Sequence, residues 1–183
     1  SNTQWTDVLT GELFFAINQS MTVSMPSALS ETYGLRILVE NPVADPGFEL
    51  QATSTVSSPW ASAGMCGIDR NLGWQLYGLN NAWIIPQPGD NRIYQDIPVQ
   101  TDTNYRLTGF IQTSGPDAEG AFGVMTTSGT VIEETAIGYR PVYTKVDVDF
   151  NSGSNTTIRI YLRMNGQASV TFSRLDNVSL IRH

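Results

Sequence analysis

The spacing of apolar residues constrains the fold of this chain more than any other feature. In the run 143–150, Val146, Val148 and Phe150 alternate with charged residues. A period of two places one set of side chains on one face of a β-strand and the other set on the opposite face. Nowhere does the sequence show the longer period of an amphipathic helix. We therefore predict an all-β protein.

A second alternating run spans residues 157–164, with Ile158, Ile160 and Leu162 on one face. The polar segment 151–155 separates it from the first run, and this arrangement predicts an antiparallel hairpin. Many short strands separated by Gly, Pro, Asn and Asp predict an antiparallel β-sandwich of the jelly-roll type. Further strands are predicted at Arg92–Val99, Asn104–Thr113, Gly120–Thr126, Val131–Ile137, Ala168–Phe172 and Asp176–Ile181.

The length of 183 residues suits one domain with a short additional segment. The Pro- and Gly-containing segment Asn41–Gly47 is typical of a loop that opens a domain. We expect residues 41–183 to form the sandwich, and residues 1–40 to be extra strands or the tail of a preceding module. Within residues 1–40, Glu12–Asn18 and Met21–Met25 predict a hairpin, and Tyr33–Val39 predicts a strand.

Composition excludes several classes of function. Charged residues make up 15% of the chain and the formal net charge is −7. Without a basic face the chain is not expected to bind nucleic acid, and without a long apolar stretch it is not expected to span a membrane. The single cysteine, Cys66, permits no internal disulfide and is expected to be a small buried residue. The low charge and the many turn residues are typical of a secreted β-protein.

Several short motifs occur in a fixed order over most of residues 41–183. They are Asp45-Pro46-Gly47-Phe48-Glu49, Pro59-Trp60, Gly78-Leu79-Asn80-Asn81-Ala82-Trp83, Tyr94-Gln95-Asp96-Ile97-Pro98-Val99 and Leu175-Asp176-Asn177-Val178-Ser179-Leu180. Together these motifs resemble the carbohydrate-binding modules with a galactose-binding-like jelly roll, in the neighbourhood of families four, sixteen and twenty-two. The resemblance implies a secreted, monomeric, non-catalytic module that targets an attached glycoside-degrading enzyme to its polysaccharide. The chain departs from the family pattern at two places. Ser62 stands where relatives often have a cysteine that pairs with the position of Cys66. Gly89-Asp90-Asn91 stands before the Tyr94-Gln95 strand, where relatives often have an aromatic residue.

A sugar ring presents an apolar face of C–H groups and a rim of hydroxyls. A site for it needs exposed aromatic rings and planar amide, carboxylate or guanidinium groups. Alternatives stay open for several residues, since Trp60 and Trp74 can cap the core and residues 159–163 can form a solvated strand face. The candidate ligand-binding residues are Trp83, Trp74, Tyr77, Gln95, Tyr94, Arg70, Arg92, Tyr161 and Arg159.

The resemblance also implies a structural Ca²⁺ that ties the opening loop to the last strand. The matching positions make Glu49 and Asp176 the carboxylate ligands, with backbone carbonyls completing the six to eight oxygens that Ca²⁺ requires. Asp45 and Gln51 are possible additional ligands. The alternative is that these side chains hydrogen bond to loop amides.

We do not expect an enzyme. The only histidine is His183, the last residue, so triads that require histidine and multi-histidine metal sites are excluded. Two alternatives to a polysaccharide-binding module remain. One is a structural or adhesive extracellular sandwich. The other is a small jelly-roll lyase or glycosidase, with Tyr161 and Arg159 or with two carboxylates among Asp117, Glu119, Glu133 and Glu134.

Overall fold

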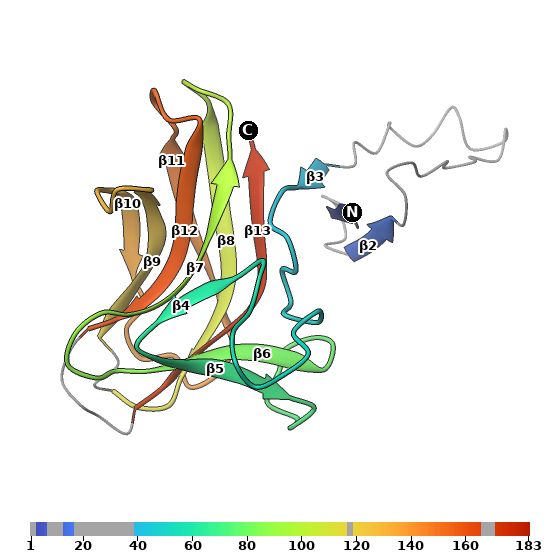
Figure 1. Cartoon of the computed structure of the whole chain (residues 1–183), viewed down its shortest axis with the longest axis vertical. Coiled ribbons are helices and arrows are strands. Elements are labelled where there is room, and N and C mark those ends of the chain that lie inside the picture. The colour runs from blue at the N-terminus through green and yellow to red at the C-terminus, as the bar shows by residue number, and fades with distance from the viewer. Residues whose placement is uncertain (1–2, 7–12, 17–38, 117–118, 166–170) are drawn as a thin grey trace, which may run out of the picture. The chain divides into compact units, whose positions relative to one another are not determined.

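The structure, a computed structural model, describes residues 3–6, 13–16, 39–116, 119–165 and 171–183 (Figure 1). All regular elements among these residues are β-strands, as predicted. The described residues contain no helix long and apolar enough to cross a membrane. The chain divides into two compact units, Ser1–Pro42 and Val43–His183.

The first unit contains a three-stranded antiparallel sheet of order β2-β1-β3, formed by β1 (Thr3–Thr6), β2 (Leu13–Ala16) and β3 (Val39–Asn41). The central strand β1 pairs with both neighbours. Strand β2 lies within the predicted strand Glu12–Asn18. Its predicted partner Met21–Met25 and residues 33–38 lie outside the described residues.

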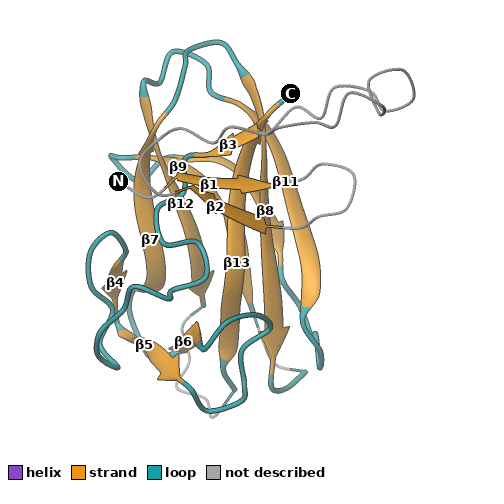
Figure 2. Ribbon diagram, turned by 90° about the vertical axis from the view of Figure 1, so that its right-hand side faces the viewer, coloured by secondary structure: helices purple, strands orange, loops and turns teal. Residues whose placement is uncertain are grey.

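The second unit is a sandwich of two antiparallel five-stranded sheets, and Figure 2 shows their long strands in two groups. Sheet I has the order β10-β9-β12-β7-β4 and sheet II the order β11-β8-β13-β6-β5. In sheet I the strands are β4 (Ala61–Ala63), β7 (Asn91–Pro98), β9 (Gly120–Thr126), β10 (Val131–Ala136) and β12 (Thr157–Met164). In sheet II they are β5 (Met65–Arg70), β6 (Asn80–Ile85), β8 (Asn104–Thr113), β11 (Thr144–Asn151) and β13 (Ser173–Arg182).

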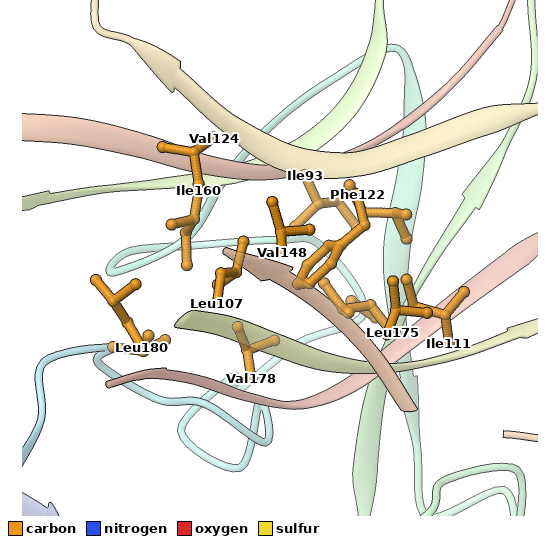
Figure 3. Close-up of a cluster of buried hydrophobic side chains, with 14 of the residues drawn as sticks. Ile93, Leu107, Ile111, Phe122, Val124, Val148, Ile160, Leu175, Val178 and Leu180 are labelled. Atoms are coloured by element: carbon orange, nitrogen blue, oxygen red, sulfur yellow. The ribbon is translucent and has the colours of Figure 1, made fainter. Parts of the chain in front are cut away.

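The core lies between the two sheets and is built from the apolar members of the alternating runs. Ile93 and Ile160 from sheet I face Leu107, Val148 and Leu175 from sheet II (Figure 3). Each of these side chains is buried, and such burial stabilises the fold by about 1.5–3 kcal/mol per side chain. The core therefore fixes which side chains of each strand point outward.

One sequence-based prediction of strand pairing is wrong. The runs that become β11 and β12 do not form a hairpin, because β11 pairs with β8 in sheet II and β12 pairs with β7 and β9 in sheet I. The apolar faces of the two strands meet in the core from opposite sheets instead of lying side by side. The predicted strand Ala168–Phe172 falls largely outside the described residues.

Candidate functional site

The outer side of sheet I carries a row of arginine and tyrosine side chains. On β7 the core takes Ile93 and Ile97, so Arg92, Tyr94 and Asp96 point outward. On β12 the same alternation turns Arg159, Tyr161 and Arg163 outward, with Tyr161 directly opposite Tyr94 and Arg159 opposite Asp96. We call these six residues, together with Glu134 of β10, the Arg–Tyr face.

Arg159 holds one end of the Arg–Tyr face in a fixed geometry. Its Nε and one Nη donate hydrogen bonds of 2.6 and 2.8 Å to the two carboxylate oxygens of Asp96. Its guanidinium carbon also lies 4.2 Å from the ring centroid of Tyr94. A bidentate pair of this kind fixes the orientation of both planar groups. The edges of these groups that face solvent can bond to neighbouring hydroxyls of a sugar.

Glu134 organises the other end of the face. It accepts a hydrogen bond of 2.5 Å from the Tyr161 hydroxyl and bonds of 2.7 and 3.1 Å from the Arg163 guanidinium. Hydrogen bonds from Arg163, and then from Tyr161, lower the pKa of Glu134 below its ordinary value. The Glu134 side chain crosses β9 at Gly123 to reach β12. A side chain at position 123 would block this path, because its Cβ would lie 2.5 Å from the Cβ of Glu134. A carboxylate held ionised in this way is a hydrogen-bond acceptor and a poor proton donor.

The charges of the Arg–Tyr face are balanced. Arg92 pairs with Asp90, as Arg159 does with Asp96 and Arg163 with Glu134. Tyr161 points away from the core and is nevertheless only 1% exposed. Its neighbours on the face therefore enclose its ring. A charge-balanced surface of fixed donors and acceptors suits a neutral polar ligand better than an anionic one.

A second surface with exposed aromatic rings lies on the loop Asn71–Leu79, which joins β5 to β6 and which we call the aromatic loop. Trp74 is 51% exposed and Tyr77 is 58% exposed, and Leu72 and Leu79 of the same loop are also exposed. Large exposed apolar side chains gathered on one short segment mark an interaction surface more often than single ones do.

Two carboxylates from distant parts of the chain hold the backbone of the aromatic loop. Oδ2 of Asp176 accepts hydrogen bonds from the N–H groups of Leu76 at 2.8 Å and Tyr77 at 3.1 Å. Oε1 of Glu49 accepts bonds from the N–H groups of Leu79 at 2.9 Å and Asn80 at 3.0 Å. These bonds order the loop before any ligand binds, which lowers the entropic cost of binding.

Arg174 of β13 supports the ring of Trp74. The guanidinium carbon of Arg174 lies 4.6 Å from the centroid of the Trp74 ring and 4.2 Å from that of Phe172. An ion pair of 3.0 Å with Asp69 fixes the same guanidinium. The Trp74 side chain is thus positioned from one side and remains half exposed.

The structure sorts the predicted ligand-binding residues into three groups. Arg92, Tyr94 and Arg159 come together on the Arg–Tyr face, whereas Tyr161, opposite Tyr94, is buried and supports the face without being accessible to a ligand. Trp74 and Tyr77 lie on the aromatic loop, and Arg70 is exposed where that loop begins. Trp83 and Gln95 belong to neither surface.

Trp83, the first of the candidate ligand-binding residues, lies within β6 and is partly buried. Its ring covers Gly67 on β5, where a Cβ would lie 2.5 Å from the ring. On sheet II it stands opposite Arg174. The Trp83 ring therefore packs against β5 on the outer side of sheet II.

Gln95 points inward, in contrast to the prediction that it binds a ligand. It is 5% exposed. Its amide accepts a hydrogen bond of 2.8 Å from the N–H of Ala44 and donates one of 2.8 Å to the Ala44 carbonyl. Both polar groups of the amide hold the opening loop, so we do not include Gln95 in the candidate site.

Sequence reasoning missed several residues of these surfaces. Asp96 alternates with Tyr94 on β7, so the period of the strand contained a signal for it. Arg174 and Phe172 had no such signal, because their contact with Trp74 depends on the order of strands in sheet II. Of the loop acids considered, Asp117 lies outside the described residues.

The two predicted calcium ligands lie close together and fit a hard cation in kind and charge. Both side chains lie beside Gly47. A Cβ atom placed on this glycine would be 3.7 Å from Oδ1 of Asp176 and 3.7 Å from Cγ of Glu49. Asp176 is fully buried, and burial, together with the nearby charge of Glu49, raises its pKa to about 7. Among the described residues no cationic side chain forms an ion pair with either carboxylate. A group of three or more metal-binding side chains is not found in that part of the chain either.

Cys66 is half-buried and its Sγ lies 3.1 Å from the carbonyl oxygen of Ala63. Burial is the largest cause that raises the pKa of its thiol to about 12. The thiol is therefore protonated at neutral pH and a poor nucleophile.

No protein-family model and no curated protein matches the chain. Solved structures match residues of this chain at low sequence identity. A family 61 carbohydrate-binding module in complex with β-1,4-galactotriose has a TM-score of 0.60 and 17% identity, covering 78% of this chain and 99% of that module. The CBM22-1 xylan-binding domain of Paenibacillus barcinonensis Xyn10C has a TM-score of 0.54 and 12% identity, covering 74% and 90%.

The N-terminal cellulose-binding domain of Cellulomonas fimi β-1,4-glucanase C has a TM-score of 0.53 and 14% identity, covering 71% of this chain and 92% of that domain. These likenesses confirm the predicted β-sandwich and the resemblance in fold to carbohydrate-binding modules of the jelly-roll type.

Proposed function

We propose that the domain is a non-catalytic module that binds a neutral polysaccharide on the Arg–Tyr face. The observation that carries the proposal is the fixed arrangement of Tyr94 and Arg159 with Asp96. It combines a ring with bidentate donors and acceptors on the outer side of sheet I. The fold shared with carbohydrate-binding modules supports the same class of ligand.

The chemistry of the face suits binding more than cleavage. The glycosidase mechanism needs a carboxylic acid that can donate a proton to the leaving oxygen. Glu134 has a lowered pKa because Arg163 and Tyr161 stabilise its charged form. The Tyr161 hydroxyl, whose pKa is raised mainly by burial, donates its hydrogen bond to Glu134 and not outward. We therefore propose a binding role, in a secreted protein in which an attached catalytic domain acts on the polysaccharide.

We also propose that Glu49 and Asp176 contribute ligands to a bound Ca²⁺. Such an ion would neutralise the two carboxylates where they meet beside Gly47. In its presence the same side chains would still hold the aromatic loop through their hydrogen bonds.

Affinity gel electrophoresis tests the proposed function. The chain is run through gels that contain β-1,4-galactan, xylan, β-glucan, mannan, pectin or alginate. We expect retardation by at least one neutral polysaccharide, and strong weakening of that retardation by Tyr94→Ala. The exposed residue Val131 on the edge strand β10 gives a control, because its side chain lies beyond Met125 on the outer side of sheet I and is not one of the seven residues of the Arg–Tyr face. If none of the six polysaccharides slows the native chain, the proposed function is wrong.

A further inference from the structure

The aromatic loop and the Arg–Tyr face lie on opposite sides of the sandwich. Leu175 of β13 is in the core, so its neighbour Arg174 points outward from sheet II. The Trp74 ring stacks on the Arg174 guanidinium and therefore lies on the same outer side. Ile93 of β7 is in the same core, so its neighbour Tyr94 points outward from sheet I. Figure 1 shows β5 and β6, which the aromatic loop joins, together at the lower end of this sandwich.

The conformation of the aromatic loop is fixed by contacts with other parts of the sandwich. Arg174 supports the Trp74 ring, and the Tyr143 hydroxyl donates a 3.0 Å hydrogen bond to the Trp74 carbonyl. The N–H of Asn71 closes the base of the loop by a 2.6 Å bond to the carbonyl of Leu79. Together with the bonds to the two carboxylates, these contacts fix both ends and the middle of the loop.

The size of the exposed surface favours a sugar over a protein partner. A whole aromatic side chain buries roughly 150–250 Å², and Trp74 and Tyr77 are each about half exposed. Both rings together therefore offer roughly 200 Å², far below the roughly 800 Å² per partner of a stable protein interface. A pyranose ring needs only the area of one aromatic ring and a few hydrogen-bonding groups beside it.

We infer that the aromatic loop is a second polysaccharide-binding site, and that the module can bridge two polysaccharide chains. The second site takes the apolar face of a neutral pyranose on Trp74 or Tyr77, with the exposed guanidinium of Arg70 at the base of the loop as a donor. The inference rests on the proposed function for the class of ligand. It adds a second site that is independent of the Arg–Tyr face.

Because the two surfaces face in opposite directions, the module would bridge two polysaccharide chains when both sites are occupied. One extended polysaccharide segment that lies on sheet I does not reach the outer side of sheet II. Two segments therefore bind to one module, and on a polymer the two weak contacts reinforce each other through effective concentration.

Two measurements on the full chain test the inference. Isothermal titration with β-1,4-galactotriose, and separately with xylohexaose, gives the number of oligosaccharides bound per chain. Light scattering of mixtures with β-1,4-galactan or xylan reports bridging of polymer chains. The variants are Trp74→Ala and Tyr77→Ala on the loop, Tyr94→Ala on the Arg–Tyr face, the double variant Trp74→Ala with Tyr94→Ala, and Val131→Ala as the control.

We expect the native chain and Val131→Ala to bind two oligosaccharides and to increase the scattering of the polymer. Trp74→Ala and Tyr94→Ala should each bind one oligosaccharide and cause no bridging, and the double variant should bind none. Tyr77→Ala, whose side chain is largely exposed, serves as the loop variant if Trp74→Ala does not fold.

Two results would overturn the inference. If Trp74→Ala and Tyr77→Ala both keep the native stoichiometry and bridging, the loop is not a binding site, and the proposed function survives. Loss of all binding in Trp74→Ala, with native binding in Tyr94→Ala, would show a single site on the loop and would reject the Arg–Tyr face. Light scattering of the protein alone must show a monomer, because a dimer through the loop would also explain bridging and would overturn the inference.

Discussion

The N–H of Tyr77 donates a hydrogen bond of 3.1 Å to Oδ2 of Asp176, a residue 99 positions further along the chain. The same oxygen accepts the N–H of Leu76, and Oδ1 accepts the N–H of Asn177 at 2.7 Å. A single buried carboxylate thus links the last strand of the sandwich to the loop that presents Trp74 and Tyr77.

The substitution Asp176→Asn should loosen the aromatic loop. An asparagine has one acceptor oxygen in place of two, and its NH₂ group would face a backbone N–H. A buried donor left without a partner costs about 1–3 kcal/mol. Amide hydrogen exchange measured by NMR should therefore become faster at Leu76 and Tyr77. Asp102→Asn is a matched control on an exposed turn, and it should leave these rates unchanged. Unchanged exchange in Asp176→Asn itself would refute the anchoring role.

Calcium should raise the melting temperature of the protein, and EDTA should lower it. A ligand that binds only the folded state at 100 times its Kd stabilises that state by about 2.7 kcal/mol. Differential scanning calorimetry with and without Ca²⁺ measures the shift. The response should disappear in Glu49→Gln, which removes a charged ligand and keeps the size of the side chain. Identical melting temperatures in Ca²⁺ and EDTA would reject the calcium proposal.

The period-two pattern predicts the strands of the core well, because alternation is a local property of the sequence. Strands β8, β9 and β12 begin and end at the predicted residues. The pattern does not say which sheet a strand joins, and the hairpin predicted for β11 and β12 is wrong for that reason. Strands β4, β5 and β6 lie among turn residues and have little alternation, so the sequence did not reveal them.

The candidate surfaces were predictable to a similar extent. Residues that alternate along one strand, such as Arg159 and Tyr161, could be placed on one face from the sequence alone. Their contacts with Tyr94 and Glu134 depend on strand order, which brings together segments far apart in the chain. Gln95 lies next to Tyr94, and the alternation of β7 turns it inward, where it meets Ala44.

The Glu134 carboxylate should make the stability of the domain depend on pH in acid. Hydrogen bonds from Arg163 and Tyr161 hold the pKa of Glu134 in the folded protein below its ordinary value of 4.5. The unfolded chain therefore takes up this proton at a higher pH than the folded chain does. The stabilisation is complete above pH 4.5 and is lost as the pH falls through the folded-state pKa.

Urea unfolding at a series of pH values tests this prediction. Glu134→Gln should lower the free energy of unfolding at neutral pH and reduce its slope below pH 4.5. The exposed neighbour Glu133 gives the matched control, since Glu133→Gln should keep the native slope. A native slope in Glu134→Gln would mean that other carboxylates govern the acid transition.

Trp60 should stabilise the sandwich without taking part in ligand binding. Its ring lies 4.8 Å from that of Phe48, and its Nε1 donates a hydrogen bond of 2.8 Å to the Asp45 carbonyl. Trp60→Phe keeps an aromatic ring and removes the donor, so we expect a loss of about 1–2 kcal/mol from the hydrogen bond and the reduced packing. Trp60→Ala should cost about 3–5 kcal/mol. Because Trp60 is buried, retardation in the affinity gel should be native for each variant that is still folded. A Trp60→Phe protein of native stability that has lost binding would place this residue at a ligand site and contradict the structure.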